Sequence, residues 1–162
     1  QVKPLFYAVD SIINFRMKLS EYDYKGAEID FGNAYSYAEK IEGFDTYQID
    51  NHHSRFILEN EMEFGSQKTC MEAFKRAHSI LIDPKHRESA LYYPYRVAQK
   101  YYPFYEKYYK GMNKSEKQVF VNACETMLSR CEWYISNHTT PEGIRTAKDA
   151  KTLLTKIINE TM

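Results

Sequence analysis

The sequence predicts an all-α fold, an irregular stack of about seven antiparallel helices. Apolar residues recur every three or four positions along nearly all of the 162-residue chain, which is the helical period. Only 5 prolines and 6 glycines interrupt the chain, so long elements are expected. Alternation of apolar and polar residues over more than four positions is absent, as are Asn-Gly and Asp-Gly hairpin turns.

The first half of the sequence predicts four helices, covering residues 5–21, 27–41, 46–63 and 67–82. Pro4 stands where a proline in the first turn is tolerated, and the segment after it is unusually apolar. Gly43 follows the second helix as a C-terminal glycine, and Asp45 is the expected N-cap of the third. Pro84 ends the fourth, because a residue before proline disfavours helical backbone angles.

The second half predicts three longer helices, covering residues 91–110, 113–136 and 140–159. Pro103 lies inside the first of these and should kink the helix or split it at Tyr102. Gly111 closes that helix, and either Asn113 or Ser115 is the expected cap of the next. Thr140 before a first-turn proline marks the start of the last helix. Short connections favour antiparallel neighbours.

Tyrosine is the most unusual part of the composition. Eight of the 15 tyrosines lie between residues 92 and 109. Tyr95, Tyr102, Tyr105 and Tyr109 share one helical stripe, which we expect to pack between helices with each hydroxyl finding a partner. The remainder would form an exposed aromatic surface, of the kind found in protein interfaces.

Charge is unevenly distributed although the formal net charge is zero. Residues 21–63 contain 11 acidic and 3 basic residues, and residues 85–118 contain 8 basic and 3 acidic residues. Two interpretations remain open. These charges either form solvated helix faces or attract a charged partner to one end of the molecule.

The tyrosines and the basic residues interleave, and this mixture predicts a binding surface. The residues expected to contact the partner are Tyr95, Arg96, Lys100, Tyr101 and Tyr105. The expected partner is a protein or peptide, most favourably an acidic one. Single-stranded nucleic acid is the alternative, since lysines suit phosphates and rings suit base stacking, although the chain is not basic overall. Structural self-association through the apolar first segment is a third reading.

No pattern in the sequence indicates catalysis or a cofactor. His52 and His53 are adjacent and would point about 100° apart on a helix, so a shared metal ion is not expected. All-helical ribonucleases of the HEPN class need an arginine followed four to six residues later by a histidine, which does not occur here. The Gly-x-Ser-x-Gly nucleophile motif is also missing. We therefore expect no enzyme activity, metal or cofactor within this chain.

Parts of the chain resemble tetratricopeptide-type helical repeats. Residues 31–35 (FGNAY) look like the first-helix signature of such a repeat. Cys70, Phe74 and Ala77, followed by Asp83 and Pro84, look like the second-helix signature. The 34-residue period is not kept, so the resemblance implies an irregular, tetratricopeptide-like stack that binds other proteins.

A second resemblance is to the helical C-terminal regions of large bacterial phage-defence proteins with a sirtuin-like or P-loop NTPase module. It rests on residues 49–59 (IDNHHSRFILE) and 93–98 (YPYRVA). This likeness implies a target-sensing module whose enzyme would lie elsewhere in the parent chain. The missing initiator methionine likewise led us to expect a fragment.

These observations together predict one helical domain over residues 1–162. Its parts would be an N-terminal apolar helix (1–22), repeat-like helices (27–110) and a C-terminal helix pair (113–162). No apolar run approaches the roughly 18 residues that span a bilayer, so no membrane association is expected. Three cysteines without framework spacing indicate a reducing compartment, and we expect a cytoplasmic location.

Overall fold

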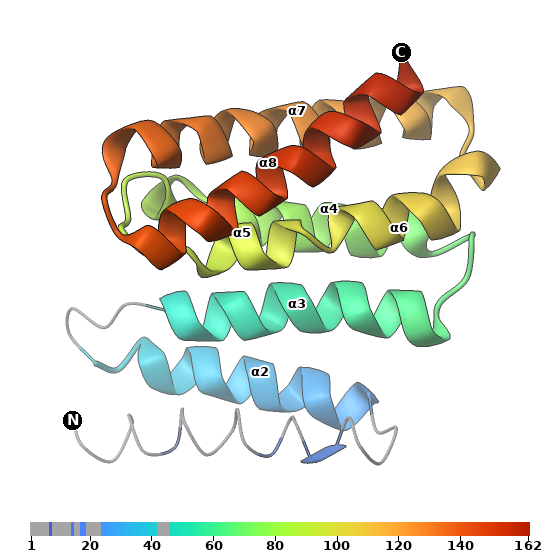
Figure 1. Ribbon diagram of the computed structural model, residues 1–162. Helices are drawn as coiled ribbons and strands as arrows, with labels where there is room; N and C mark the ends of the chain where they lie inside the picture. Colours follow the sequence, from blue (N-terminus) through green and yellow to red (C-terminus); the bar gives the residue numbers. More distant parts are fainter. Residues whose placement is uncertain (1–6, 8–13, 15–16, 19–23, 42–45) are drawn as a thin grey trace. The chain divides into compact units, whose positions relative to one another are not determined.

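The computed structural model describes residues 7, 14, 17–18, 24–41 and 46–162, and all regular structure within these ranges is helical (Figure 1). The described elements are α2 (Tyr24–Ala38), α3 (Tyr47–Phe64), α4 (Cys70–Leu81), η1 (Pro84–His86), α5 (Tyr93–Ala98), α6 (Tyr101–Tyr108), η2 (Tyr109–Gly111), α7 (Lys114–Asn137) and α8 (Pro141–Thr161). The prediction of an all-α fold is confirmed. The expected helix over residues 5–21 and the Asp45 cap lie outside the described residues, apart from isolated positions.

The chain forms two compact units, residues 1–53 and 54–162, and the division falls within α3. The sequence predicted one helical domain. In the first unit, α2 buries Ala27, Phe31, Ala34 and Ala38, which recur at the three- and four-residue spacing of one helix face. Ile49 of α3 is also buried in this unit.

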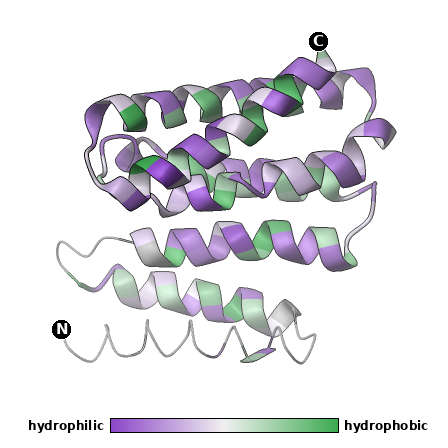
Figure 2. Ribbon diagram, in the orientation of Figure 1, coloured by the Kyte–Doolittle hydropathy of each residue, from purple (hydrophilic) through white to green (hydrophobic). Residues whose placement is uncertain are grey.

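The second unit is built around the antiparallel pair α7 and α8, which pack along each other more extensively than any other two helices described (Figure 1). Shorter helices α5 and α6 also pack on α8. Each long helix shows apolar and polar bands, as an amphipathic helix in a layered fold should (Figure 2). Asn113 caps α7 through a reciprocal capping box with Glu116, in which each side chain accepts from the other residue's backbone N–H.

Two observations explain how the second unit packs so closely. Phe74 of α4 is the centre of an aromatic core, with ring centroids 4.9 Å from Tyr101, 5.2 Å from Phe104 and 4.8 Å from Phe120. At the other end of α7, Gly143 lies against Tyr134, and a Cβ atom at residue 143 would be 2.2 Å from the tyrosine hydroxyl oxygen. A glycine is required there for α8 to approach α7.

The predicted helix over residues 91–110 is split, but upstream of the predicted position. It divides at Gln99 and Lys100 into α5 and α6, not at Tyr102. Pro103 then falls in the first turn of α6. Backbone N–H groups in a first turn have no acceptor within the helix, so a proline there costs no helical hydrogen bond. The proline thus begins a new helix instead of kinking an existing one.

Candidate functional site

The split of this helix changes which tyrosines face the core. The core side of α6 carries Tyr101, Phe104 and Tyr108, all buried. Tyr95 of α5 is buried, as its predicted stripe required, but Tyr102 of the same predicted stripe is only half-buried. The prediction assumed one continuous helix. The break at residues 99–100 changes which residues after it face the core.

Tyr95 and Tyr101 were expected to contact a partner, and the structure corrects this. Tyr101 is fully buried and shares a hydrogen bond of 2.7 Å with Nδ1 of His78. Tyr95 is 3% exposed and packs its ring 4.9 Å from that of Tyr134. Burial raises the pKa of both hydroxyls. These two residues belong to the core and offer no surface to a ligand.

Tyr105, the third predicted tyrosine, stands in a half-buried row with Tyr102 and Tyr109. Its ring centroid lies 5.8 Å from that of Tyr102 and 5.1 Å from that of Tyr109. Lysine ammonium groups cover the row at both ends, with Lys156 4.9 Å from the Tyr102 ring and Lys117 5.1 Å from the Tyr109 ring. A base stacking on the Tyr102 or Tyr109 ring would therefore compete with a lysine of this chain for one face of that ring.

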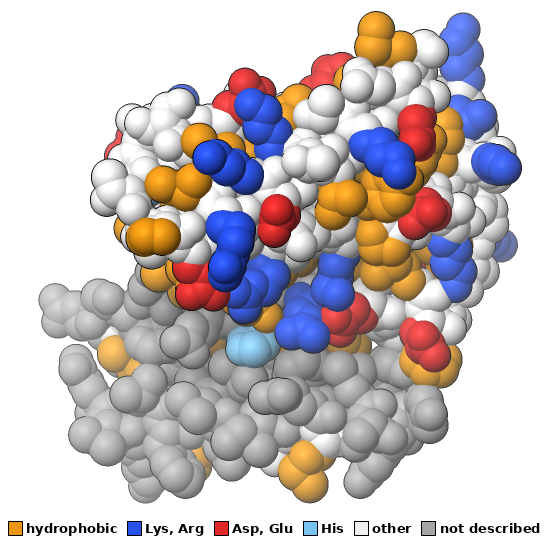
Figure 3. All heavy atoms as spheres, viewed as in Figure 1, with side chains coloured by type: hydrophobic (Ala, Val, Ile, Leu, Met, Phe, Trp, Pro, Cys, Tyr) orange, Lys and Arg blue, Asp and Glu red, His pale blue; other side chains and the backbone are white. Residues whose placement is uncertain are grey.

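Arg96 and Lys100, the two predicted cations, do come together on the surface. They line a groove of about 380 Å³ that lies wholly within the second unit. The groove is lined by Arg55, Tyr93, Arg96, Val97, Gln99, Lys100, Pro103 and Leu153. These residues come from α3, α5, α6 and α8 and the break between α5 and α6. In Figure 3 the basic side chains of this unit lie interspersed with carboxylates.

Glu59 organises two of the three cations in this groove. Its Oε1 atom accepts from Nε of Arg55 at 2.7 Å and lies 2.9 Å from Nζ of Lys100. Arg55 also donates to the hydroxyl of Tyr93 at 3.3 Å. Partial burial would raise the pKa of Glu59, but the hydrogen bonds from Arg55 and Lys100 outweigh it and lower the pKa. Glu59 is therefore ionised at neutral pH, and its single carboxylate pairs with the two cations Arg55 and Lys100.

Arg96 is held more loosely than the other two. Its Nη2 atom lies 3.3 Å from Oε1 of Glu142, and both side chains are about half exposed. The guanidinium also lies 5.7 Å from the ring of Tyr92 and 5.8 Å from that of Tyr93. Exposed pairs of this kind contribute only about 0–1 kcal/mol. An incoming carboxylate can replace Glu142 at little cost.

The sequence did not identify Arg55 and Glu59 as part of this site. Their spacing of four residues on a helix is a readable signal for an ion pair. Their meeting with Lys100 is a tertiary contact between residues 41 positions apart, counted from Glu59 to Lys100, and the local pattern carries no sign of it.

A separate polar cluster lies in the first unit. Asp50 is 5% exposed and accepts hydrogen bonds from the hydroxyls of Tyr35 at 2.6 Å and Thr46 at 3.0 Å. His53 stacks on Phe31 with ring centroids 4.6 Å apart, and its Nδ1 lies 3.4 Å from the Tyr35 hydroxyl. These contacts join α2 to the first turns of α3, so we assign them a packing role.

Three further features bear on the classes of function. In the described part of the chain, no three His, Cys, Asp or Glu side chains converge in a way that could hold a metal ion. None of the described helices combines the length and apolar character needed to cross a membrane. Cys70, Cys124 and Cys131 are all buried free thiols.

Comparison with family models, with curated protein sequences and with solved structures found no match. The functional argument therefore rests on the geometry of the second unit.

Proposed function

We propose that this chain is a protein-interaction module that binds an acidic segment of a protein partner in the groove around Arg96 and Lys100. The observation that carries the proposal is the excess of cations there. Arg55, Arg96 and Lys100 face the groove, whereas Glu59 and Glu142 supply two carboxylates. The groove thus keeps one positive charge and many unused guanidinium N–H donors.

The apolar part of the groove suits a peptide backbone or side chain lying between the charges. Pro103 and Leu153 are the accessible apolar side chains among the cations and the Tyr93 ring, since Val97 is buried. A tyrosine beside arginines is a frequent combination in interface hot spots, because both supply contact area and directed hydrogen bonds. A glutamate side chain entering here would meet Arg96 in the place of Glu142.

The lysines already placed on the Tyr102 and Tyr109 rings favour a peptide partner over single-stranded nucleic acid. A role as the sensor region of a larger bacterial defence protein, in a tetratricopeptide-like arrangement, is part of the same proposal. So is a cytoplasmic location, which suits three free thiols.

The test is fluorescence anisotropy with a labelled glutamate-rich peptide and its glutamine analogue. The double variant R96Q/K100Q removes two groove cations and should weaken binding of the acidic peptide by about ten-fold or more, since hydrogen bonds to charged groups contribute about 1.5–3 kcal/mol each. The matched control is K75Q/R145Q, which removes two exposed positive charges from α4 and α8 outside the groove.

Three results would overturn the proposal. The first is equal binding of the acidic peptide and its glutamine analogue by the unaltered protein. The second is an equal loss of affinity in both double variants, which would indicate a general charge effect. The third is tight, salt-sensitive binding of a single-stranded oligonucleotide with no binding of the peptide, which would support the nucleic-acid alternative.

A further inference from the structure

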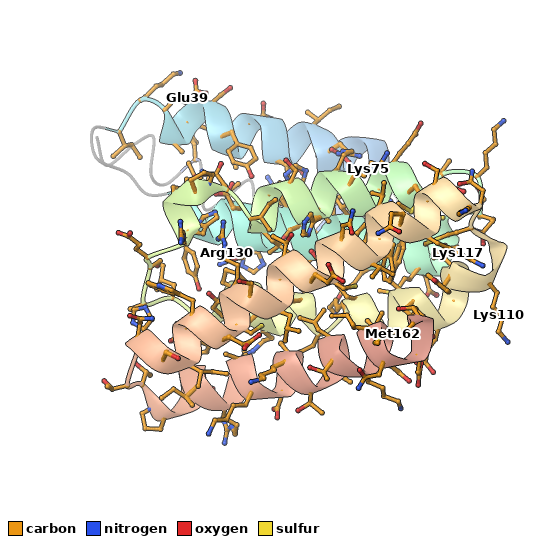
Figure 4. All side chains as sticks on the ribbon, turned by 90° about the horizontal axis from the view of Figure 1, so that it is seen from above. Glu39, Lys75, Lys110, Lys117, Arg130 and Met162 are labelled. Atoms are coloured by element: carbon orange, nitrogen blue, oxygen red, sulfur yellow. The ribbon has the colours of Figure 1, made fainter. Side chains whose placement is uncertain are left out.

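A second hollow in the same unit has a different chemistry and is not used by the proposed interaction. It has a volume of about 460 Å³ and lies beside the C-terminal half of α7. Its lining consists of Arg87, Glu125, Thr126, Ser129, Arg130 and Trp133. Figure 4 shows Arg130 well separated along α7 from Lys117.

Arg130 is fixed in place by the end of α4. Its Nη2 atom donates to the carbonyl oxygen of Ile82 at 2.6 Å, which satisfies a carbonyl that the helix itself leaves unpaired. This bond uses one of the five N–H donors of the guanidinium. Because the side chain is half-buried and hydrogen-bonded, its conformations are restricted, and the remaining donors stay at the hollow.

The second arginine of the hollow, Arg87, adds another positive charge. Among the residues that the structure describes, neither Arg87 nor Arg130 forms an ion pair within 4.0 Å. Burial and the positive charge of Arg87 lower the pKa of Arg130. Tyr95 and Asp83 act in the opposite direction, but the net effect is a lowered pKa. Asp83 itself accepts from the backbone N–H of Lys85.

The remaining lining residues narrow the kind of anion that fits. Ser129 supplies a hydroxyl, whereas the Thr126 hydroxyl already donates to the carbonyl of Asn122 at 3.0 Å. Glu125 disfavours a ligand that fills the hollow with negative charge. The indole of Trp133 is half-buried, and its ring centroid lies 5.3 Å from that of His138. A ligand that meets all of these is anionic at one end and flat and apolar at the other.

We propose that this hollow binds a phosphate monoester whose organic part carries an aromatic or base ring. Arg87 and Arg130 contact the phosphoryl oxygens, Ser129 donates a hydrogen bond, and the ring lies against Trp133. Two guanidinium groups match a doubly charged phosphoryl group better than a single carboxylate. Inorganic phosphate alone would fill only a small part of the volume, which is why the ring is included.

The chain provides its own reporter for this site, because Trp133 is its only tryptophan. The experiment titrates the whole chain with inorganic phosphate, phenyl phosphate, AMP and adenosine, exciting Trp133 at the red edge of its absorption band to avoid the nucleotide. A saturable change in Trp133 emission is expected with phenyl phosphate or AMP. Inorganic phosphate should bind more weakly, and adenosine, which lacks the phosphoryl group, should not bind.

Variants distinguish this site from general charge effects. R87Q removes an exposed arginine whose side chain forms no hydrogen bond or ion pair with the described residues, and it should raise the Kd by about ten-fold. R130K keeps the charge but loses the planar fork, and should also weaken binding. K75Q, the matched control on α4, should leave the titration unchanged.

The comparison between phenyl phosphate and AMP identifies the source of the ligand. Tighter binding of phenyl phosphate indicates a phosphorylated tyrosine, and tighter binding of AMP indicates a mononucleotide. Either result supports the site. The inference is overturned if none of these probes gives a saturable change up to about 10 mM, a range that covers even very weak affinities, or if R87Q and K75Q bind equally well. These outcomes are independent of the peptide experiment, which uses other residues.

Discussion

Replacing Gly143 with alanine should destabilise the second unit, because the added methyl group would occupy space that Tyr134 already fills. The new Cβ atom would lie 2.2 Å from the hydroxyl oxygen and 2.9 Å from Cζ of Tyr134. Tyr134 is fully buried, its hydroxyl donates to the carbonyl of Ala90 at 2.8 Å, and its ring lies 4.5 Å from that of His138. The ring therefore has no free space into which it could move.

The expected magnitude follows from opposing effects. Overpacking a core costs about 1–3 kcal/mol, and weakening the buried Tyr134–Ala90 hydrogen bond costs about 1 kcal/mol. Alanine is favoured over glycine in a helix by up to about 1 kcal/mol. G143A should thus lose about 1–3 kcal/mol. For a urea m-value of about 2 kcal/mol/M, the midpoint should fall by about 0.5–1.5 M.

Urea unfolding followed by Trp133 fluorescence measures this loss, since the tryptophan lies next to Tyr134 in sequence and reports on the same unit. The control is Y134F, which removes the oxygen that the methyl group would strike. G143A should cost less in the Y134F background than in the unaltered chain, giving a favourable coupling energy. A neutral or stabilising G143A, or strict additivity in the double variant, would refute the close packing of α8 on Tyr134.

Two further predictions concern stability. Burial, with a smaller effect of Arg130, lowers the pKa of His78 to about 4, so the unfolded chain binds this proton first, near the ordinary pKa of about 6.5. The free energy of unfolding is then highest above about pH 6.5 and falls by up to about 3 kcal/mol as the pH drops toward 4. Urea titrations at several pH values measure this fall, which should be smaller in H78Q. N113A removes the capping box of α7 and should lower the free energy of unfolding by about 1 kcal/mol. The control S115A alters a residue of the same turn that is not part of the box, and it should change the free energy of unfolding little. Equal losses in the two variants would contradict the assigned cap.

The sequence was sufficient for the elements whose signals are local. The helical spacing of α2 and the restart at Pro141 are encoded within a few residues, and the structure has both helices where they were predicted. For α7 the structure selects Asn113 over Ser115 as the cap. The buried cysteines of α7 follow from the same helical spacing. Periodicity and capping depend on near neighbours, which is why they can be recognised without tertiary information.

The register after the α5–α6 break could not be predicted in this way. A proline is compatible with a kink at its own position or with a new helix that starts two residues earlier, and the local pattern does not choose between them. The structure has the new helix, which places Tyr101 in the core and leaves Tyr105 half-buried. Of the predicted site residues, Arg96 and Lys100 line one groove, whereas Tyr95 and Tyr101 lie in the core.

Charge reversal in the groove tests the central claim most directly. In R96E/K100E the groove would carry a negative excess, so a lysine-rich peptide should bind and the glutamate-rich peptide should not, while circular dichroism confirms that the helices remain. The unaltered protein should show the opposite preference in the same anisotropy assay. If reversal of these two charges leaves the preference for acidic peptide unchanged, the groove around Arg96 and Lys100 is not the binding site.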